Sequence, residues 1–396
     1  MGDIGVIKPI VGGGLLPNLT TLAEELRSVG YSTQAVGKWH LGFCKKDYLP
    51  TYRGFDHHYG YWLGSQDYYK HTNKIWSHTG YDFREDLAVD YGAKGVYSSV
   101  LFEKRAVNVI ESHNQSKPLF LYLAFQSPHT PLQAPEEYIK MYDHVEDEDR
   151  RVYLGMVTAM DDAVGGVIAS LKKMKMFENT IILFLSDNGG NVWHGGSNWP
   201  LRGKKGRLWE GGTRTPAFIQ GPGLHKKVEQ NMFHVTDWYP TIMEMINKKS
   251  QEHAIDGISE WKALSGKSHN WERKELVYNI KEKLLNLTDP IAAIRIGDWK
   301  YIWSMDDDYA GWEIPSENGT RQFNKSEPQC FTNLLFNLSE DPHEKNDLSS
   351  RETIRAMKMQ EKLKIHMQTS MHLSYKKNMK AANPDKHGGL WSTDWC

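Results

Sequence analysis

Apolar residues recur every three or four positions along several parts of the chain, which is the spacing of an amphipathic helix. In the first of these segments Thr21 and Glu24 fit a capping box, and Gly30 suits the position after the last turn. The same periodicity runs without a break through a much longer segment that starts near residue 150. We expect helices at about 19–30, 98–112, 150–173 and 352–367.

Other segments are short and continuously apolar or rich in β-branched residues, and these predict strands. They read "STQAVG" at 32–37, "PLFLYLAFQ" at 118–126, "TIILFLS" at 180–186 and "PAFIQGPG" at 216–223. The second and third runs predict buried strands, because they lack the alternation of a half-exposed sheet. Strands that alternate with helices predict an α/β fold with a mainly parallel sheet flanked by helices.

The composition changes near residues 265–275, where the chain reads "SGKSHNWERKE". Short strand signals follow, including "AAIRIGDWKYIW" at 292–303, before the last predicted helix. We therefore expect a large α/β domain at 1–275 and a small C-terminal α+β domain at 276–396. The chain shows no internal repeat.

Polar side chains directly follow three of the predicted strands. Lys38 and His40 follow the first strand, His129 follows the second, and Asp187 and Asn188 follow the third. In open α/β sheets ligands bind beyond the carboxyl ends of the strands, so these side chains are expected to converge on one site. Taken alone, each has a plainer explanation: a hydrogen-bonded histidine, a solvated lysine, or a tight Asp-Asn-Gly-Gly turn.

The residue types indicate chemistry on an anion. Asp187 and Asn188 offer oxygen ligands for a hard cation such as Ca²⁺ or Mg²⁺, and lysines and histidines stabilise negative charge. The later loop "WPLRGKKGRLWEGG" carries Lys205 and is either an anion-facing loop or a solvated basic turn. In an extended segment Lys38 and His40 would point the same way and Trp39 the opposite way, into packing.

Charge and composition exclude some partners. The chain has 396 residues and a formal net charge of −1, so no overall field favours nucleic acid or an anionic membrane surface. No run of about 18 apolar residues predicts a membrane-spanning helix, and the first residues lack the pattern of a signal peptide. The three cysteines leave at least one unpaired within the chain.

Candidate glycosylation sequons favour a secretory route, although the first residues show no signal-peptide pattern. Six asparagines begin an Asn-x-Ser/Thr triplet, which favours a secretory or lysosomal route. They are Asn18, Asn114, Asn286, Asn318, Asn324 and Asn337. The sequence alone leaves the compartment open.

Several motifs in order resemble one enzyme family. The segments "VGKWHLG", "RGFDHHYGYWLGSQDYY", "PLFLYLAFQSPHTPLQAPEEY", "FLSDNGG", "NWPLRGKKGRLWEGGTRTP" and "LFNLSEDPHEKNDLS" are similar to those of the sulfatases, and most of all to the arylsulfatase B group, the N-acetylgalactosamine-4-sulfatases. The resemblance covers residues 17 to 350. It implies an alkaline-phosphatase-like α/β domain with a small C-terminal domain, lysosomal or secreted location, and hydrolysis of sulfate esters on sulfated sugars or aryl sulfates.

The resemblance also implies roles for single residues. Asp187 and Asn188 match ligands of the Ca²⁺ ion, and Lys38 and Lys205 match lysines that contact the sulfate. His40 matches a histidine beside the family's formylglycine nucleophile. His129 matches a histidine near the leaving-group oxygen, a candidate general acid.

The chain departs from the family at the nucleophile. Formylglycine arises from the first residue of Cys/Ser-x-Pro-x-Arg, and no such pentapeptide occurs here. The family's early Asp pair has no counterpart either, because Asp161 and Asp162 fall on the solvated face of a predicted helix. We expect an incomplete Ca²⁺ site, and a large domain without its first strand and nucleophile segment.

Three functions follow from these observations. The first is an arylsulfatase B-like hydrolase that is inactive as this chain stands, for want of the nucleophile. The second is a pseudoenzyme that binds sulfated glycans or a protein partner. The third is a phosphatase-like relative, since phosphate and sulfate are both tetrahedral anions.

Overall fold

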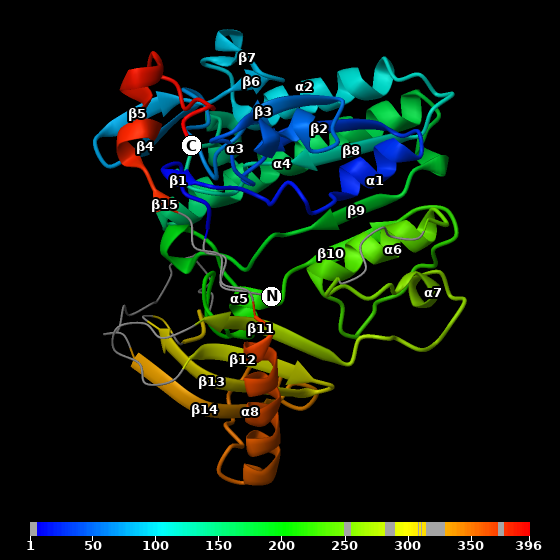
Figure 1. Ribbon diagram of the computed structural model, residues 1–396, viewed down its shortest axis with the longest axis vertical. Coiled ribbons are helices and arrows are strands. Elements are labelled where there is room, and N and C mark those ends of the chain that lie inside the picture. The colour runs from blue at the N-terminus through cyan, green and yellow to red at the C-terminus, as the bar shows by residue number, and fades with distance from the viewer. Residues whose placement is uncertain are drawn as a thin grey trace. The chain divides into compact units, whose positions relative to one another are not determined.

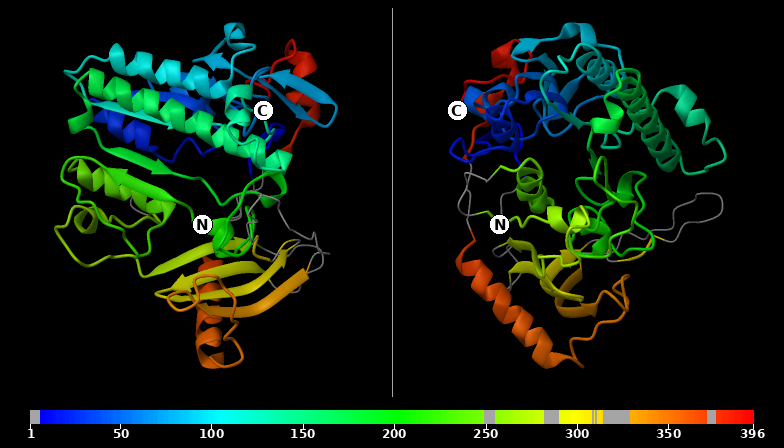
Figure 2. Two further views of the ribbon diagram at one scale, coloured as in Figure 1. Left: turned by 180° about the vertical axis from the view of Figure 1, so that it is seen from behind. Right: turned by 90° about the vertical axis from the view of Figure 1, so that its right-hand side faces the viewer.

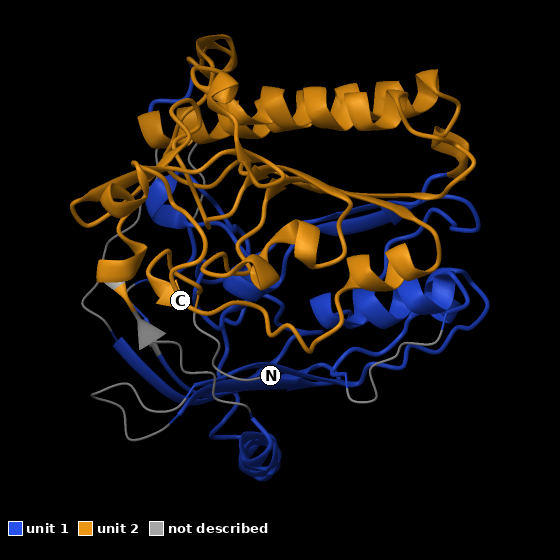
Figure 3. Ribbon diagram, turned by 45° about the horizontal axis from the view of Figure 1, so that its top comes forward, with its two compact units in different colours: residues 1–4, 144–147, 180–373 blue, residues 5–143, 148–179, 374–396 orange. Residues whose placement is uncertain are grey.

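The computed structural model describes residues 6–248, 255–281, 290–307, 309, 311–313, 329–370 and 376–396. The chain forms two compact units (Figure 3). Unit 1 comprises residues 1–4, 144–147 and 180–373, and unit 2 comprises residues 5–143, 148–179 and 374–396. This division does not test the expected domain boundary at residue 275, which stays a prediction.

Unit 2 is built on a five-stranded sheet in the order β7-β6-β3-β2-β8 (Figure 1). Its strands are β2 (Ser32–Lys38), β3 (His57–Tyr61), β6 (Arg84–Glu85), β7 (Ala88–Val89) and β8 (Leu119–Ala124). Strands β3, β2 and β8 are parallel, the short strand β6 pairs antiparallel with β3, and β7 pairs antiparallel with β6. The predicted α/β class with a mainly parallel sheet is therefore confirmed, and β2 and β8 are neighbours in it.

Helices cover this sheet on both faces: α2 and α4 lie side by side on one face and α1 on the other (Figures 1 and 2). The helices of unit 2 are α1 (Leu22–Ser28), α2 (Ser98–Glu111), α3 (Glu136–Lys140), α4 (Glu148–Lys173) and α9 (Met379–Ala382). The predicted capping box is present, because the Thr21 hydroxyl accepts from the Glu24 amide and the Glu24 carboxylate accepts from the Thr21 amide. Asp161 and Asp162 lie on the exposed face of α4, as predicted.

Two small ladders complete unit 2: β4 (Thr72–Ile75) with β5 (His78–Tyr81), and β1 (Val11–Gly12) with β15 (Lys376–Lys377). The C-terminal segment packs here, and Trp391 is fully buried in the aromatic core. Cys44 and Cys396 form a disulfide, whereas Cys330 is a free, exposed thiol in unit 1.

Unit 1 contains an antiparallel pair, β9 (Ile182–Leu185) with β10 (Ala217–Gln220), and an antiparallel four-stranded sheet. That sheet consists of β11 (Glu275–Lys281), β12 (Ile291–Ile296), β13 (Trp299–Asp307) and β14 (Gln329–Asn337) in sequence order. The helices are α5 (Glu210–Thr213), α6 (Trp238–Met245), α7 (Trp261–Leu264) and α8 (Thr353–Gln368). Helix α8 packs its buried Ala356, Met359 and Leu363 against the sheet.

The structure corrects two details of the sequence prediction. The runs at 180–186 and 216–223 pair antiparallel with each other, not within the parallel sheet. The strand signals at 292–303 are confirmed as the hairpin of β12 and β13, with Gly297 at a positive φ of 56° between them. The strands predicted to be buried are only partly covered, with Tyr122 44% and Leu185 38% exposed.

Helix α4 is the one helix, among those the structure describes, that is long and apolar enough to cross a membrane by length and composition. It packs against α2 and α3 and buries Met156, Ala159 and Ala163 within unit 2. Core helices of soluble proteins pass the same test, so this is weak evidence for a membrane span.

Candidate functional site

The carboxyl end of β2 requires a glycine next to β8. A Cβ added to Gly37 would lie 2.0 Å from the carbonyl oxygen of Ala124, and Gly37 has a φ of 106°. Only glycine meets both conditions without strain. Lys38, the last residue of β2, is thereby placed at the same sheet edge as the segment that follows β8 and carries His129.

His40 does not continue the strand. Its φ of 63° is left-handed, so the predicted alternation from Lys38 ends at Trp39. The His40 amide donates to the carbonyl of Trp62, and its Nε2 lies 3.1 Å from the carbonyl oxygen of Ile7. The ring fits because Gly64 has no side chain, since a Cβ there would lie 2.5 Å from the ring.

Trp39 packs inward, as the sequence predicts. It is 6% exposed, its indole donates to the carbonyl of Tyr48, and its ring meets Phe55 edge-on. Tryptophan therefore anchors the chain between Lys38 and His40.

His129 lies in a half-buried loop beyond β8, with cis peptide bonds at Pro128 and Pro131. Its Nδ1 lies 2.8 Å from the carbonyl oxygen of Thr130, so the hydrogen-bond pattern assigns the proton to Nδ1. The Tyr68 hydroxyl donates to the carbonyl of His129. Hydrogen bonds thus hold both the backbone carbonyl and the Nδ1 of His129.

Asp82 supports the strand end that holds His40. This fully buried carboxylate accepts from the amides of Trp62 and Leu63, immediately after β3. Burial raises the pKa of Asp82 to about 6, against the opposing charge of Arg84 and the hydrogen bonds from the two amides. No pattern in the sequence indicated Asp82, which lies 13 residues after the quoted segment at 53–69.

The other predicted residues lie in unit 1. Asp187 is exposed at the end of the segment that follows β9, and the Asn188 side-chain amide donates to the carbonyl of Gly189. Gly189 has no room for a side chain, because a Cβ would lie 1.8 Å from the carbonyl oxygen of Gly211. The Asp-Asn-Gly-Gly loop is therefore a tight turn packed against the "WEGG" segment. The loop can be a tight turn and also carry the proposed metal ligands Asp187 and Asn188.

Asn198 joins the loop of Asp187 to the loop of Lys205. Its Oδ1 accepts from the Gly190 amide at 2.7 Å, and its Nδ2 donates to the carbonyls of Gly190 and Gly203 at 3.0 Å each. The Lys205 amide also donates to the carbonyl of Gly190. Asn198 was not among the predicted site residues, although it begins the quoted "NWPLRGKKG" segment.

Each unit thus carries one group of the predicted residues. Unit 2 holds Lys38, His40 and His129 at neighbouring strand ends, and unit 1 holds Asp187, Asn188 and Lys205 in hydrogen-bonded loops. The convergence of strand ends is observed for β2 and β8, and β9 belongs to a separate ladder.

The donor set of Asp187 and Asn188 suits Ca²⁺ in kind but not in number. Ca²⁺ takes six to eight oxygens, and no group of three or more His, Cys, Asp or Glu side chains in the described part of the chain could hold a metal ion.

A buried ionic network supports the Lys205 loop from the C-terminal sheet. The Lys300 ammonium is fully buried and lies 2.8 Å from a carboxylate oxygen of Glu210 and 2.8 Å from one of Glu344. The Tyr278 hydroxyl also donates to Glu210, and the Glu210 amide donates to Glu344. Residues 90 and 134 positions apart in sequence are brought together, which no local pattern could have indicated.

The charges in this network set its titration. Burial pushes the pKa of Glu210 up, but the Lys300 charge and hydrogen bonds lower it overall. Burial raises the pKa of Glu344, and the two carboxylates together raise the pKa of Lys300 despite its burial. Lys300 is therefore a permanent buried cation at neutral pH.

Three of the predicted sequons fall on described residues. Asn18 and Asn114 are exposed, whereas Asn337 is half-buried and its side-chain oxygen accepts from Ser339. Asn286, Asn318 and Asn324 lie outside the described residues.

Comparison with known proteins identifies the family to which these features correspond. The sulfatase family model matches residues 3–248. Mouse arylsulfatase J is 36% identical over 98% of this chain and 68% of its own length, and mouse N-acetylgalactosamine-6-sulfatase is 26% identical over 86% and 66%. The chain spans about two thirds of the length of these relatives.

A solved structure has the same fold. It is Ps i-CgsB in complex with k-i-k-neocarrahexaose, with a TM-score of 0.77 at 26% identity over 98% of this chain and 83% of that one. The expected alkaline-phosphatase-like architecture with a small C-terminal antiparallel sheet is confirmed. The comparisons establish a likeness to arylsulfatase J and do not single out arylsulfatase B.

Proposed function

Because the chain belongs to the sulfatase family, we propose that its protein hydrolyses sulfate esters on sulfated sugars, with 4-sulfated N-acetylgalactosamine of glycosaminoglycans as the substrate. The observation that carries the proposal lies in unit 2, where Lys38 ends β2 and His129 follows the neighbouring strand β8 with its Nδ1 2.8 Å from the carbonyl oxygen of Thr130. The relatives named for N-acetylgalactosamine-6-sulfate and the structure with a bound carrageenan hexasaccharide support a sulfated glycan as substrate class.

The residues of this chain bind and move protons in this proposal. Lys38 contacts a sulfate oxygen, where a fixed ammonium stabilises the negative charge that develops, and Lys205 is the second candidate sulfate-contacting lysine. His129, with its proton on Nδ1 directed to Thr130, presents Nε2 to the leaving oxygen and donates a proton there when protonated. His40 is held by backbone groups on both sides, which suits a positioning role beside the reacting group.

In the family the hydrated formylglycine supplies the nucleophile and Ca²⁺ supplies charge stabilisation. The printed sequence contains no Cys/Ser-x-Pro-x-Arg, so we expect these 396 residues by themselves to bind sulfated ligand without turnover. Asp187 and Asn188 would contribute two of the metal's oxygen ligands.

A lysosomal or secreted location fits the same proposal. The Cys44–Cys396 disulfide is typical of oxidising compartments, and the sequons at Asn18 and Asn114 are exposed. Endoglycosidase treatment of the protein from animal cells should lower its apparent mass, and an unchanged mass would count against this route.

The central test is ligand binding to the purified chain by isothermal titration calorimetry. A 4-sulfated N-acetylgalactosamine disaccharide should bind, and its unsulfated form should bind at least tenfold more weakly. Lys38→Ala and Lys205→Ala should each weaken binding about tenfold, because each removes a charged hydrogen bond. Lys104→Ala, an exposed lysine of α2, is the matched control and should leave the affinity unchanged.

Activity is tested separately. If the transcript upstream of Met1 encodes Cys/Ser-x-Pro-x-Arg, the longer protein should release sulfate from the disaccharide. Release of phosphate from aryl phosphates without sulfate release would favour the phosphatase alternative. A transcript without the motif, together with sulfate-dependent binding that needs Lys38 and Lys205, would favour the pseudoenzyme.

A further inference from the structure

A second pocket of unit 2 lies at the opposite end of the parallel strands from Lys38 and His129. It has a volume of about 640 Å³, within the range of small-molecule sites. It is lined by the starts of β2 and β3, the segment before β8, the C-terminal end of α1 and the C-terminal half of α2. We call it the amino-end pocket. Ser32, which lines the pocket at the start of β2, lies six positions before Lys38, which is about 20 Å of extended chain.

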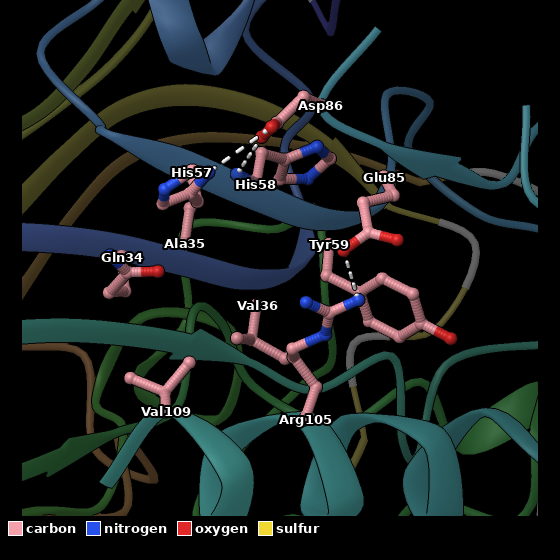
Figure 4. A pocket seen from close by; sticks show the side chains of 10 residues that line it. All are labelled: Gln34, Ala35, Val36, His57, His58, Tyr59, Glu85, Asp86, Arg105 and Val109. Atoms are coloured by element: carbon pink, nitrogen blue, oxygen red, sulfur yellow. Dashed lines mark hydrogen bonds and ion pairs between the residues drawn. The ribbon is translucent and has the colours of Figure 1, made fainter. Parts of the chain in front are cut away.

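The floor of the amino-end pocket continues into a small cavity of about 20 Å³ (Figure 4). Both are lined by Gln34, His57, Glu85 and Arg105. The cavity has room for one water molecule, which needs polar partners to be held.

His58 supplies an unsatisfied polar atom at this cavity. The ring is 2% exposed, and its Nε2 lies 3.2 Å from the carbonyl oxygen of Gly37. Its buried Nδ1 has no hydrogen-bond partner among the described residues. Burial lowers the pKa of His58 to about 4, so at neutral pH Nδ1 is an acceptor for a water or a ligand hydroxyl.

The polar groups of the amino-end pocket are held in place before any ligand arrives. The Arg105 guanidinium pairs with Glu85 at 2.6 Å and lies 4.1 Å from the ring centre of Tyr59 (Figure 4). Arg27 pairs with Asp56 at 3.2 Å. Planar guanidinium, carboxylate and amide groups offer donors and acceptors side by side, which is what the neighbouring hydroxyls of a sugar ring require.

The side chains that line the amino-end pocket carry one more positive charge than negative charge. Three cations line it, and two of them pair with its two carboxylates. For the third, Lys117, no ion pair occurs within the described part of the chain, and it lies at the exposed rim before β8. A ligand with many hydroxyls and an acidic group matches this arrangement.

We propose that the amino-end pocket binds an acidic oligosaccharide, with Lys117 contacting its sulfate or carboxylate and the arginine–carboxylate pairs contacting its hydroxyls. This rests on the proposed action on sulfated sugars and adds a second contact for a long glycan, remote from Lys38. Asn114 begins a sequon at the rim, so the pocket accepts an oligosaccharide only in protein that carries no glycan at Asn114, whereas a glycan at Asn18 leaves it open.

The test uses the full chain from a host without N-glycosylation and measures binding of a chondroitin 4-sulfate hexasaccharide by calorimetry. Lys117→Glu should weaken binding about tenfold, and Asn108→Ala, on the pocket wall, several-fold. Lys104→Glu makes the same charge change on α2 outside the pocket and should leave binding within twofold. Maltohexaose, a neutral hexasaccharide, should bind more weakly than the acidic probe.

The outcomes separate this inference from the proposed function. Hexasaccharide binding that falls with Lys38→Ala but is unchanged by Lys117→Glu and Asn108→Ala overturns the amino-end pocket and leaves the proposed function standing. Equal losses with Lys117→Glu and Lys104→Glu overturn it too, because they would show a general charge effect. Loss with Lys117→Glu at unchanged affinity for the 4-sulfated disaccharide supports it.

Discussion

Replacing Lys300 by methionine should destabilise unit 1 strongly and in a way that depends on pH. The ammonium is fully buried, and both Glu210 and Glu344 lie 2.8 Å from it. Methionine fills much of the same volume but leaves two carboxylates buried beside each other without a cation. Removing one partner of a buried ion pair costs about 3–5 kcal/mol, and we expect a loss of that size in the free energy of unfolding at pH 7.5.

The pH dependence follows from the carboxylates. Without Lys300, the pKa of Glu210 no longer falls but rises with burial, and that of Glu344 rises further. A folded-state pKa above the unfolded value means that the folded variant takes up protons first as the pH falls, so it regains stability between pH 7.5 and about 4.5. One unit of pKa shift corresponds to about 1.4 kcal/mol, so the loss at pH 5 should be smaller by at least that amount.

The assay is urea unfolding followed by circular dichroism at pH 7.5 and pH 5. Lys364→Met is the matched control, because Lys364 is half-exposed and pairs with Glu361 on the surface of α8. It should change the unfolding free energy by less than about 0.5 kcal/mol. A loss below 1 kcal/mol for Lys300→Met, or a loss that is no smaller at pH 5, would refute the reasoning.

Three further changes test single contacts. Asp82→Asn should flatten the pH dependence of hydrogen exchange in β2 and β3, because a buried carboxyl with a pKa near 6 adds about 1.5 kcal/mol of stability as the pH falls from 7.5 to 5. Gly189→Ala should cost about 2 kcal/mol or more by urea unfolding, since its Cβ would meet a carbonyl oxygen, whereas Gly165→Ala in the open middle of α4 should stabilise by about 0.5–1 kcal/mol. Asn198→Ala should weaken sulfate binding about tenfold in calorimetry by releasing the Lys205 loop, and Asn198→Asp, which keeps only the acceptor, should do the same; unchanged binding would show that the loop holds itself.

Local signals in the sequence were enough for the helices and for part of the site. Thr21 and Glu24 specify the start of α1 with side chains that satisfy its free amides, and the structure shows both hydrogen bonds. The apolar run after Pro118 specifies a strand, and the alternation of strand and helix specifies its parallel pairing with β2. These inferences hold because the interactions act over a few residues or follow from chain connectivity.

Pairing and close backbone approach could not be predicted in the same way. An apolar run does not specify which strand it pairs with. The sequence therefore predicts β9 and β10 as strands of the parallel sheet, although they pair with each other. The alternation expected at Lys38 and His40 failed because His40 takes a left-handed conformation against Gly64, which is distant in sequence. Such contacts depend on where two segments meet.

The C-terminal sheet contributes long-range contacts to the segment that follows the Lys205 loop. Lys300 of β13 forms ion pairs with Glu210 and Glu344, and Glu344, beyond β14, accepts a hydrogen bond from the Glu210 amide. Glu210 begins α5, directly after the loop of Lys205. A buried charge can be kept only where its partners are fixed, so the loop and the sheet must fold together. Changes inside the C-terminal sheet should therefore alter sulfate binding through Lys205 without touching the ligand.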